Sequence, residues 1–218
     1  MTSSSETLSD LEAKVWACSL CDLGVSRLNA VPGEGPHNAE IICIGEAPGA
    51  NEDRQGRPFV GAAGQFLEEC LAQAGYARDE VYICNVLKCR PPNNRDPLPD
   101  EIQSCSPYLE RQLELVNPLV VVTLGRFSMA RFFPNRIISK VHGRWKQVGE
   151  RYFVPMYHPA AALHQGSLRA TLLEDFARLP KVVERAKASR ETAPNVVAGQ
   201  PSDEADSGLQ SEQMSLFD

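Results

Sequence analysis

The feature that most constrains the fold is a short apolar run followed by a glycine-rich loop, IICIGEAPGANEDRQGRPFVGAAGQFL, at residues 41–67. Residues 41–44 predict a strand buried on both faces, Gly45 ends it, and a helix is expected to start near Gly61. This order is typical of an α/β sheet, where ligands bind at the carboxyl ends of the strands. An ordinary turn or a nucleotide-phosphate loop is the alternative, although GxGxxG and GxxxxGK[ST] are both absent.

Further apolar runs predict three more strands, and helical patterns separate them. The expected strands are 81–85, 119–124 and 152–156, and the expected helices are 62–75, 100–116, 126–132 and 168–187. Glu46, Asn85 and His158 each fall at the end of a different strand. Because strand ends of such a sheet meet at one edge, we expect these three side chains to face one crevice.

The net charge of −6 does not exclude nucleic-acid binding, because the acidic residues are unevenly distributed. From Glu191 to the end the chain has six acidic residues and no Lys or Arg, which leaves 22 basic and 22 acidic residues in 1–190. A neutral body can still present a basic face to phosphates. No stretch approaches the ~18 apolar residues of a membrane span, and the start lacks the order of a secretory signal. We therefore expect a cytoplasmic protein without a membrane partner.

Seven cysteines are a generous number for a chain expected in a reducing compartment, where they indicate metal binding or reactivity rather than disulfides. Cys43, Cys70 and Cys84 lie in predicted strands or on a helix face, which indicates core packing. The other four lie in loops or at loop edges: Cys18, Cys21, Cys89 and Cys105. Four thiolates suit Zn²⁺ or a [4Fe–4S] cluster, and their spacing alone does not choose between them.

Two other segments carry binding signals. The loop LKCRPPNNRDPLPDEIQSC at residues 87–105 contains Lys88, Arg90 and Arg95, and a basic hairpin arm is expected at residues 141–146. From residue 188 the composition predicts a disordered acidic tail that ends in QMSLFD. An apolar tip on a solvated tether is typical of a short docking motif.

Taken together, these motifs resemble the family 4 uracil-DNA glycosylases, the iron–sulfur branch. GEAPGANEDRQGRPFVGAAGQFL, VYICNVLKCRPPNNRDPLPDEIQSC and HPAAAL match three motifs of that family. The resemblance covers residues 1–187, the expected glycosylase domain. It implies a three-layer α/β/α fold around a four-stranded parallel sheet, a monomer, and a [4Fe–4S] cluster on Cys18, Cys21, Cys89 and Cys105.

The resemblance also implies hydrolytic removal of uracil from DNA, and it assigns roles to the residues around the crevice. Phe59 resembles the ring that stacks on the flipped uracil, and Asn85 the group that reads its N3 and O4 edge. Ala47 stands in the uracil-binding loop, where other members carry glycine. His158 matches the donor to uracil O2. Glu46 and Glu52 are both candidates for activating the attacking water, and the sequence does not rank them.

DNA contacts are expected from Lys88, Arg90 and Arg95, together with an apolar wedge that replaces the flipped base. The leucine expected four residues after the histidine is Ala162 in this chain, so Leu163 is our interpretation of the wedge. The central loop has no histidine, unlike the related branch that traps its product covalently, so ordinary turnover is expected.

The tip QMSLFD resembles the bacterial sliding-clamp-binding motif, with Gln213, Leu216 and Phe217 as its binding residues. Two other readings of the whole chain remain open at this point. One is a non-catalytic iron–sulfur or zinc module that binds nucleic acid, such as a polymerase accessory. The other is a redox protein that uses a cluster for electron transfer.

Overall fold

The computed structural model describes residues 6–192 and is built around one sheet with the strand order β2-β1-β3-β5-β4. The strands are β1 (Ile41–Gly45), β2 (Tyr82–Asn85), β3 (Val120–Leu124), β4 (Lys146–Val148) and β5 (Arg151–Met156). β2, β1, β3 and β5 run parallel, whereas β4 is antiparallel to β5. The four predicted strands and their parallel sheet are confirmed, and β4 adds an antiparallel edge next to the expected basic arm.

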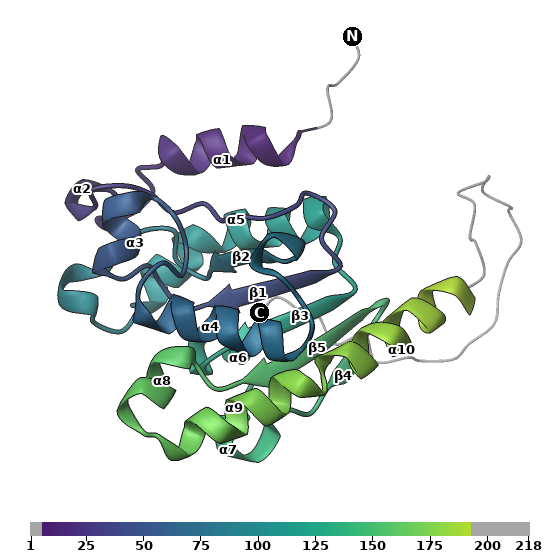
Figure 1. Ribbon diagram of the computed structural model, residues 1–218. Helices are drawn as coiled ribbons and strands as arrows, with labels where there is room; N and C mark the ends of the chain where they lie inside the picture. Colours follow the sequence, from purple (N-terminus) through teal and green to yellow (C-terminus); the bar gives the residue numbers. More distant parts are fainter. Residues whose placement is uncertain (1–5, 193–218) are drawn as a thin grey trace, which may run out of the picture.

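Ten α-helices and two short 3₁₀ turns in residues 6–192 surround the sheet (Figure 1). The helices are α1 (Leu8–Trp16), α2 (Leu23–Ser26), α3 (Ala50–Gln55), α4 (Ala62–Gln73), α5 (Pro99–Val116), α6 (Arg126–Ala130), α7 (Ile138–Val141), α8 (Pro159–His164), α9 (Ser167–Ala177) and α10 (Leu179–Thr192). The 3₁₀ turns are η1 (Arg78–Glu80) and η2 (Pro92–Asn94).

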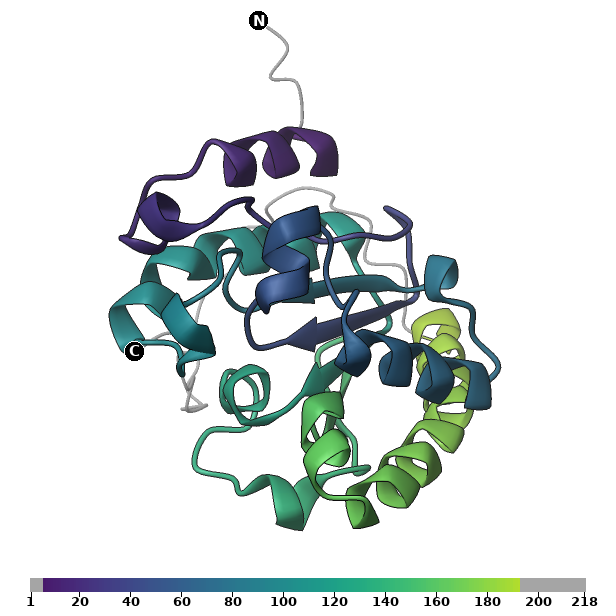
Figure 2. The ribbon, with the colours of Figure 1, turned by 60° about the vertical axis from the view of Figure 1, so that its left-hand side comes forward.

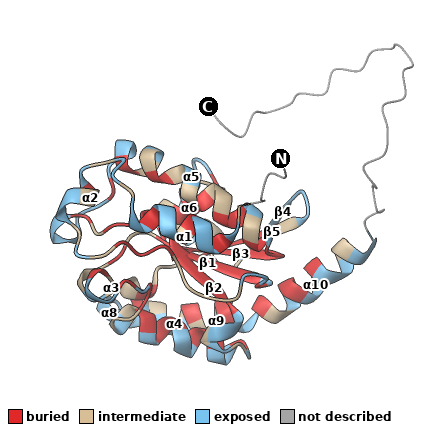
Figure 3. Cartoon of the chain, turned by 90° about the horizontal axis from the view of Figure 1, so that it is seen from above, coloured by how far each residue is buried: buried red, intermediate tan, exposed pale blue. Residues whose placement is uncertain are grey.

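The helices form a layer on each face of the sheet, which confirms the three-layer α/β/α prediction. One core joins the sheet to α4, α8, α9 and α10, and a second joins it to α1, α5 and α6. After a rotation, purple α1 lies outermost on one side and green and yellow α9 and α10 lie on the other (Figure 2). Seen from above, β1, β2, β3 and β5 are almost wholly buried, edge strand β4 is exposed, and the helices are buried mainly toward the sheet (Figure 3).

Residues of β1 explain why the strand pattern is so clear. Ile41 and Cys43 pack into the core beneath one face of the sheet, while Ile42 and Ile44 pack into the other. A strand covered on both faces needs apolar residues at every position instead of alternating ones. The interpretation of Cys43, Cys70 and Cys84 as core residues is confirmed, since all three are fully buried.

Three local features differ from the prediction. The loop after β1 contains α3, and the segment after His158 forms α8. The predicted helix 168–187 is two helices that meet around Arg178, because Pro180 has no N–H to continue the first one. α10 then continues to Thr192, so the chain stays helical beyond residue 187, where the tail was expected to begin.

Among residues 6–192, no helix has the length and apolar character needed to cross a bilayer. The acidic stretch of the predicted tail and its terminal peptide lie outside the described residues.

Candidate functional site

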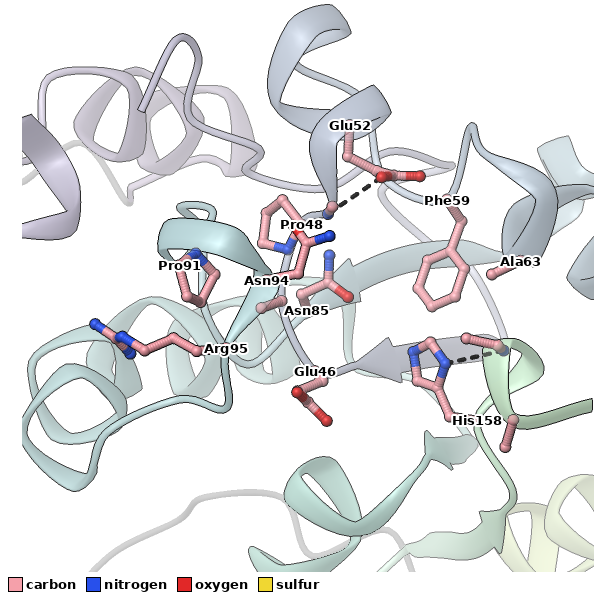
Figure 4. Close-up of a pocket in the computed structure, with 14 residues that line it drawn as sticks. Glu46, Pro48, Glu52, Phe59, Ala63, Asn85, Pro91, Asn94, Arg95 and His158 are labelled. Atoms are coloured by element: carbon pink, nitrogen blue, oxygen red, sulfur yellow. Dashed lines mark hydrogen bonds between the residues drawn. The ribbon is translucent and has the colours of Figure 1, made fainter. Parts of the chain in front are cut away.

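One pocket of about 380 Å³ opens at the carboxyl edge of the sheet (Figure 4). Glu46 directly follows β1, Asn85 ends β2, and His158 follows β5, so three strands deliver one side chain each. The lining also includes residues of the segment from β1 to the start of α4, of the loop after β2 and of the start of α8: Ala47, Pro48, Gly49, Glu52, Phe59, Ala63, Pro91, Asn94, Arg95, Ala160 and Ala161. The structure thus brings together every residue predicted for catalysis and uracil binding.

Glu46 presents a carboxylate that accepts no hydrogen bond from residues 6–192. Partial burial raises its pKa, and nearby Asp96 raises it further, while the positive charge of Arg126 acts in the opposite direction. A carboxylate with a raised pKa and vacant lone pairs is suited to accept a proton from a bound water.

Glu52 is placed differently, because its carboxylate is engaged by the backbone. It accepts hydrogen bonds from the N–H groups of Gly49 at 3.1 Å, Val60 at 2.9 Å and Gly61 at 2.9 Å. These bonds join the start of α3 to the turn that precedes α4. Glu52 therefore braces the pocket loop, and most of its acceptor capacity is already used.

Asn85 is buried at 2% exposure, and its Oδ1 finds no hydrogen-bond donor in the described part of the chain. A buried amide oxygen without a partner is costly, on the order of 1–3 kcal/mol. Gly45 makes room for this amide, because a Cβ there would lie 2.3 Å from Asn85 Oδ1 and 2.6 Å from the Phe59 ring. The pocket therefore offers an unused acceptor beside an aromatic face.

Phe59 adopts a left-handed backbone conformation with φ of +51°, which is unusual for a bulky residue. Its ring stacks on His158 with centroids 5.7 Å apart and planes at 26°. Gly64 lets α4 approach the turn, since a Cβ at that position would lie 1.8 Å from the Phe59 carbonyl oxygen. The ring is thus held at one wall of the pocket by a backbone that α4 packs against.

The sequence did not reveal the residue that clamps this turn, Arg78 in η1. Its guanidinium donates to the carbonyl oxygens of Phe59 at 3.0 Å and Pro58 at 2.5 Å. Glu68 and Glu34 hold the same guanidinium at 3.1 and 3.5 Å. No spacing or motif signals this contact, because it joins segments that meet only in the folded chain.

His158 is neutral at physiological pH, because burial lowers its pKa to about 4. Its Nδ1 accepts a hydrogen bond from the backbone N–H of Ala160 at 3.1 Å. In a neutral imidazole the other nitrogen, Nε2, then carries the proton. His158 is therefore an uncharged hydrogen-bond donor at the wall of the pocket.

The predicted DNA-contacting cations divide into two kinds. Arg90 is partly exposed and donates to Asn94 Oδ1 at 2.7 Å, and exposed Arg95 pairs with Glu101 through two bonds of 2.9 and 2.5 Å. The structure contradicts the prediction that Lys88 contacts DNA. It is only 1% exposed, and its Nζ donates to the carbonyl oxygen of Asn85 at 2.7 Å and to Gln112 Oε1 at 2.5 Å. Its charge is used inside the protein and is out of reach of DNA.

The two wedge candidates on α8 differ in exposure. Ala162 is buried at 6%, in the core beneath α8, whereas Leu163 is 46% exposed. Of these two residues, Leu163 is the one whose side chain presents apolar surface to solvent.

The four loop cysteines line one small cavity beside this site: Cys18, Cys21, Cys89 and Cys105. The Arg27 guanidinium donates to Cys89 Sγ at 3.0 Å, and the Lys88 backbone N–H donates to Cys105 Sγ at 3.3 Å. Burial raises the pKa of the Cys105 thiol to about 11. Among residues 6–192, no group of three or more Cys, His, Asp or Glu side chains is arranged to hold a metal ion.

Two contacts tie the cysteine-rich segment to the pocket. Buried Asp53 accepts hydrogen bonds from the backbone N–H groups of Leu28 at 2.9 Å and Asn29 at 3.4 Å, which fixes the segment after Cys21 against α3. On the other side, the N–H of Leu87 donates to the Glu46 carbonyl oxygen at 3.0 Å. The loop that carries Glu46 is thereby supported from the cysteine side.

Comparison with known proteins agrees with this geometry. Residues 32–179 match the sequence model of the uracil DNA glycosylase superfamily. The chain is 49% identical over 184 residues to a type-4 uracil-DNA glycosylase of Sulfurisphaera tokodaii, covering 80% of this chain and 84% of that protein. It is 48% identical over 185 residues to the type-4 enzyme of Archaeoglobus fulgidus (80% and 92% covered), and 40% identical over 187 residues to that of Thermotoga maritima (83% and 96% covered). With most of its length matched in this way, the chain belongs to the uracil DNA glycosylase superfamily.

Proposed function

We propose that this chain is a uracil-DNA glycosylase, which flips uracil out of DNA and hydrolyses its N-glycosidic bond to leave free uracil and an abasic site. Relatives that it matches over most of their length carry the name type-4 uracil-DNA glycosylase. The observation that carries the proposal is the unpartnered Oδ1 of buried Asn85 in the pocket wall. Such an oxygen is stabilised when a ligand supplies the missing donor.

Asn85 selects the base through this oxygen. Uracil carries a hydrogen on N3, which Oδ1 accepts, while the amide nitrogen donates to O4. Cytosine has an acceptor at N3 and a donor at position 4, so the order is reversed and Oδ1 stays without a partner. The ring of Phe59 supplies a flat apolar surface on which the extruded base stacks.

His158 and Glu46 carry the chemistry. Cleavage of the glycosidic bond places negative charge on uracil O2 and positive charge on the sugar, and the Nε2–H of neutral His158 donates to O2. Glu46 binds the water, accepts its proton as it attacks C1′, and offsets the charge of the sugar. Glu46 is favoured over Glu52 for this role because three backbone N–H groups already occupy Glu52.

Residues at the rim of the pocket contact the DNA on either side of the flipped base. Leu163, exposed on α8, fills the space that the flipped base leaves in the stack. Arg90 and Arg95 on the loop after β2 face the backbone, although Glu101 already neutralises part of the charge of Arg95.

We further propose that Cys18, Cys21, Cys89 and Cys105 hold a [4Fe–4S] cluster. Four thiols around one cavity, with a guanidinium and a backbone N–H directed at two of the sulfurs, suit a thiolate-bound cofactor. The cluster spreads its ligands around several iron atoms, so it does not need them to converge on one ion as zinc does. When bound, it supplies a cross-link between the amino-terminal segment and the loop after β2. Iron and acid-labile sulfide near four per chain, lost in Cys105→Ser, are the expected result.

The terminal QMSLFD is proposed to dock on a sliding clamp through Gln213, Leu216 and Phe217, which lie outside the described residues. The support is the resemblance of this peptide to the bacterial clamp-binding motif. Bacterial clamp should be retained by the full chain and released by a Leu216→Ala, Phe217→Ala double variant that keeps full glycosylase activity.

The function is tested by incubating the protein with an end-labelled duplex that contains one U opposite G, then cutting abasic sites with alkali. Matched duplexes with T or C at that position, and Asn85→Ala and His158→Ala variants, run in parallel. Cleavage only at U, reduced at least a hundredfold in both variants, supports the proposal. No cleavage by a folded protein that retains its iron would favour the non-catalytic binding module instead.

A further inference from the structure

A second basic segment lies outside the pocket and has no part in the proposed reaction. Residues 115–149 contain no Asp or Glu, although the whole chain has a net charge of −6. The same stretch carries six cations: Arg126, Arg131, Arg136, Lys140, Arg144 and Lys146. Such a one-sided distribution creates a local positive potential that the net charge conceals.

Four of these six cations are available to a ligand. All four lie in residues 136–146, which we call the basic arm. Arg126 and Arg131 pair with Asp96 and Glu110. The remaining four are exposed and form no ion pair with any residue of 6–192: Arg136, Lys140, Arg144 and Lys146. Unpaired cations are the groups that release counterions when they meet phosphates.

The basic arm forms one wall of a groove of about 360 Å³, lined also by Phe133 and Trp145. Trp145 is 41% exposed, contacts the Tyr152 ring with centroids 5.1 Å apart, and lies beneath the guanidinium of Arg185 at 4.8 Å. The ammonium of Lys146 lies 4.8 Å from the centre of the Phe133 ring. Aromatic packing therefore anchors the basic arm while its charges stay in solvent.

The strand order places the basic arm at the same edge as the pocket. β4 runs antiparallel to β5, so the residues just before β4 lie beside the carboxyl end of β5. The Gly143 N–H donates to the Pro155 carbonyl oxygen at 2.9 Å. The His142 ring packs at a tilt of 38° against Tyr157, the neighbour of His158, with centroids 4.8 Å apart. The basic arm is thus continuous with the rim of the pocket.

The pocket is bracketed by positive charge along the sheet. The loop after β2, with Arg90 and Arg95, lies at one end of the strand order, and the basic arm lies at the other. Three strand spacings separate β1 from β4, or about 14 Å at ~4.8 Å each. This distance corresponds to about four nucleotides at ~3.4 Å per step along one strand.

We propose that the basic arm is a second DNA-binding surface, which holds backbone phosphates about four nucleotides to one side of the target base. The inference rests on the proposed function only in taking uracil-containing DNA as the ligand. It predicts a footprint that extends beyond the pocket on that side of the uracil.

The test compares Lys140→Gln and Arg144→Gln with Lys187→Gln, which removes one charge paired with Glu40 near the start of β1, at the opposite edge. Binding of a 20-base-pair duplex containing a tetrahydrofuran abasic analogue is measured between about 50 and 200 mM salt. Each arm variant should make the negative slope of log affinity against log salt shallower by about 0.9 and weaken binding roughly fivefold at 100 mM. Lys187→Gln should leave both values unchanged.

Truncated duplexes test the position of the contact. With only two base pairs left on one side of the target, the arm variants and the parent should bind equally. With the other side shortened instead, the fivefold difference should persist. A difference that survives both truncations, or salt slopes equal to the parent value, would overturn the inference.

A second readout does not depend on catalysis. Trp16→Phe leaves Trp145 as the single tryptophan of the chain, and its fluorescence should change when the duplex binds. No response to DNA, with a response to an acidic peptide, would make the basic arm a protein-docking surface and overturn the inference. If U is not cleaved yet Trp145 responds and the slopes change, the proposed function fails while the DNA-binding arm stands.

Discussion

Arg78 clamps the backbone of Phe59 from outside the pocket, by donating to the Phe59 carbonyl oxygen at 3.0 Å while Phe59 holds a φ of +51°. A left-handed conformation costs a bulky residue on the order of 1–3 kcal/mol, so surrounding contacts have to maintain it. On the other side of the turn, the Glu52 carboxylate holds the backbone by accepting hydrogen bonds from the N–H groups of Val60 and Gly61. The position of the Phe59 ring in the pocket is therefore fixed by two charged residues from different segments, Arg78 and Glu52.

Replacing Arg78 should weaken base binding more than turnover. In Arg78→Gln the two carbonyl oxygens lose a charged donor, the turn relaxes, and the ring no longer fits the base. We expect KM to rise about tenfold and inhibition by free uracil to weaken equally, with kcat reduced less than threefold. Arg57→Gln is the matched control, since Arg57 also pairs with Glu34 but donates no hydrogen bond to the turn. A lower Tm with unchanged KM would mean that Arg78 is only structural.

The two glutamates should separate into a catalytic and a structural residue. Glu46→Gln should lower kcat by about 10²–10⁴-fold with Tm unchanged or slightly raised, because a partly buried carboxylate with no protein donor is removed. Glu52→Gln should lower Tm by several degrees, since an amide has one acceptor oxygen where three N–H groups are now satisfied. Thermal unfolding and single-turnover kinetics on both variants check this assignment. The reverse pattern would assign the water to Glu52.

The burial of His158 predicts a loss of stability in mild acid. Its pKa is about 4 in the folded chain and about 6.5 when unfolded, so the unfolded state binds more protons between these values. Stability from this residue is complete above about pH 6.5 and is lost as the pH falls toward 4. At pH 5 the loss is on the order of 2 kcal/mol, or about 4–8 °C in Tm. His158→Gln should show a correspondingly smaller fall in Tm between pH 7 and pH 5.

Activity should fall in acid for a different reason. The raised pKa of Glu46 keeps a proton on that carboxyl at a pH where an ordinary glutamate would have lost it. In the proposed mechanism the ionised form of Glu46 accepts a proton from water, so kcat/KM should rise with pH through this raised value and then level off. Measured on a short single-stranded substrate, the acid limb should disappear in Glu46→Gln. A limb that remains unchanged would belong to another group.

The sheet, and the three pocket residues that follow its strands, were predictable because they depend on local sequence patterns. β3, Val120–Leu124, is fully buried, and a strand covered on both faces leaves a nearly continuous apolar run in the sequence. Once such strands are parallel, their following residues meet at one edge, which is why Glu46, Asn85 and His158 could be grouped in advance.

The parts that were missed depend on tertiary contacts. α3 has no apolar face, and its buried residue is Asp53, whose carboxylate binds a distant backbone segment. Arg78 acts on a turn some twenty residues earlier. Lysine is usually a surface residue, but the Lys88 side chain points into the protein because the Asn85 carbonyl oxygen and Gln112 Oε1 accept its hydrogen bonds. No short-range sequence pattern reveals these two acceptors.

Lys88 should therefore affect stability without affecting DNA attraction. Lys88→Met leaves the Asn85 carbonyl and Gln112 Oε1 without their donor, so we expect a loss of about 1–3 kcal/mol of unfolding free energy. The salt dependence of DNA binding should stay as in the parent, in contrast to Arg144→Gln. Denaturant unfolding and affinity measurements at several salt concentrations check this. A reduced salt slope in Lys88→Met would restore the DNA contact that its burial excludes.

Leu163 should matter only when there is a base stack to fill. The exposed side chain lies on α8, which begins directly after His158, and in the proposed function it enters the duplex as the base leaves it. Leu163→Ala should lower kcat/KM about tenfold on a U·G duplex and less than twofold on single-stranded DNA, where little unstacking energy is needed. Ala162→Leu is the contrasting variant: its site is buried, so the larger side chain should lower Tm through overpacking and give no better wedge. Equal losses on both substrates in Leu163→Ala would mean that the residue shapes the pocket and does not support the flipped state.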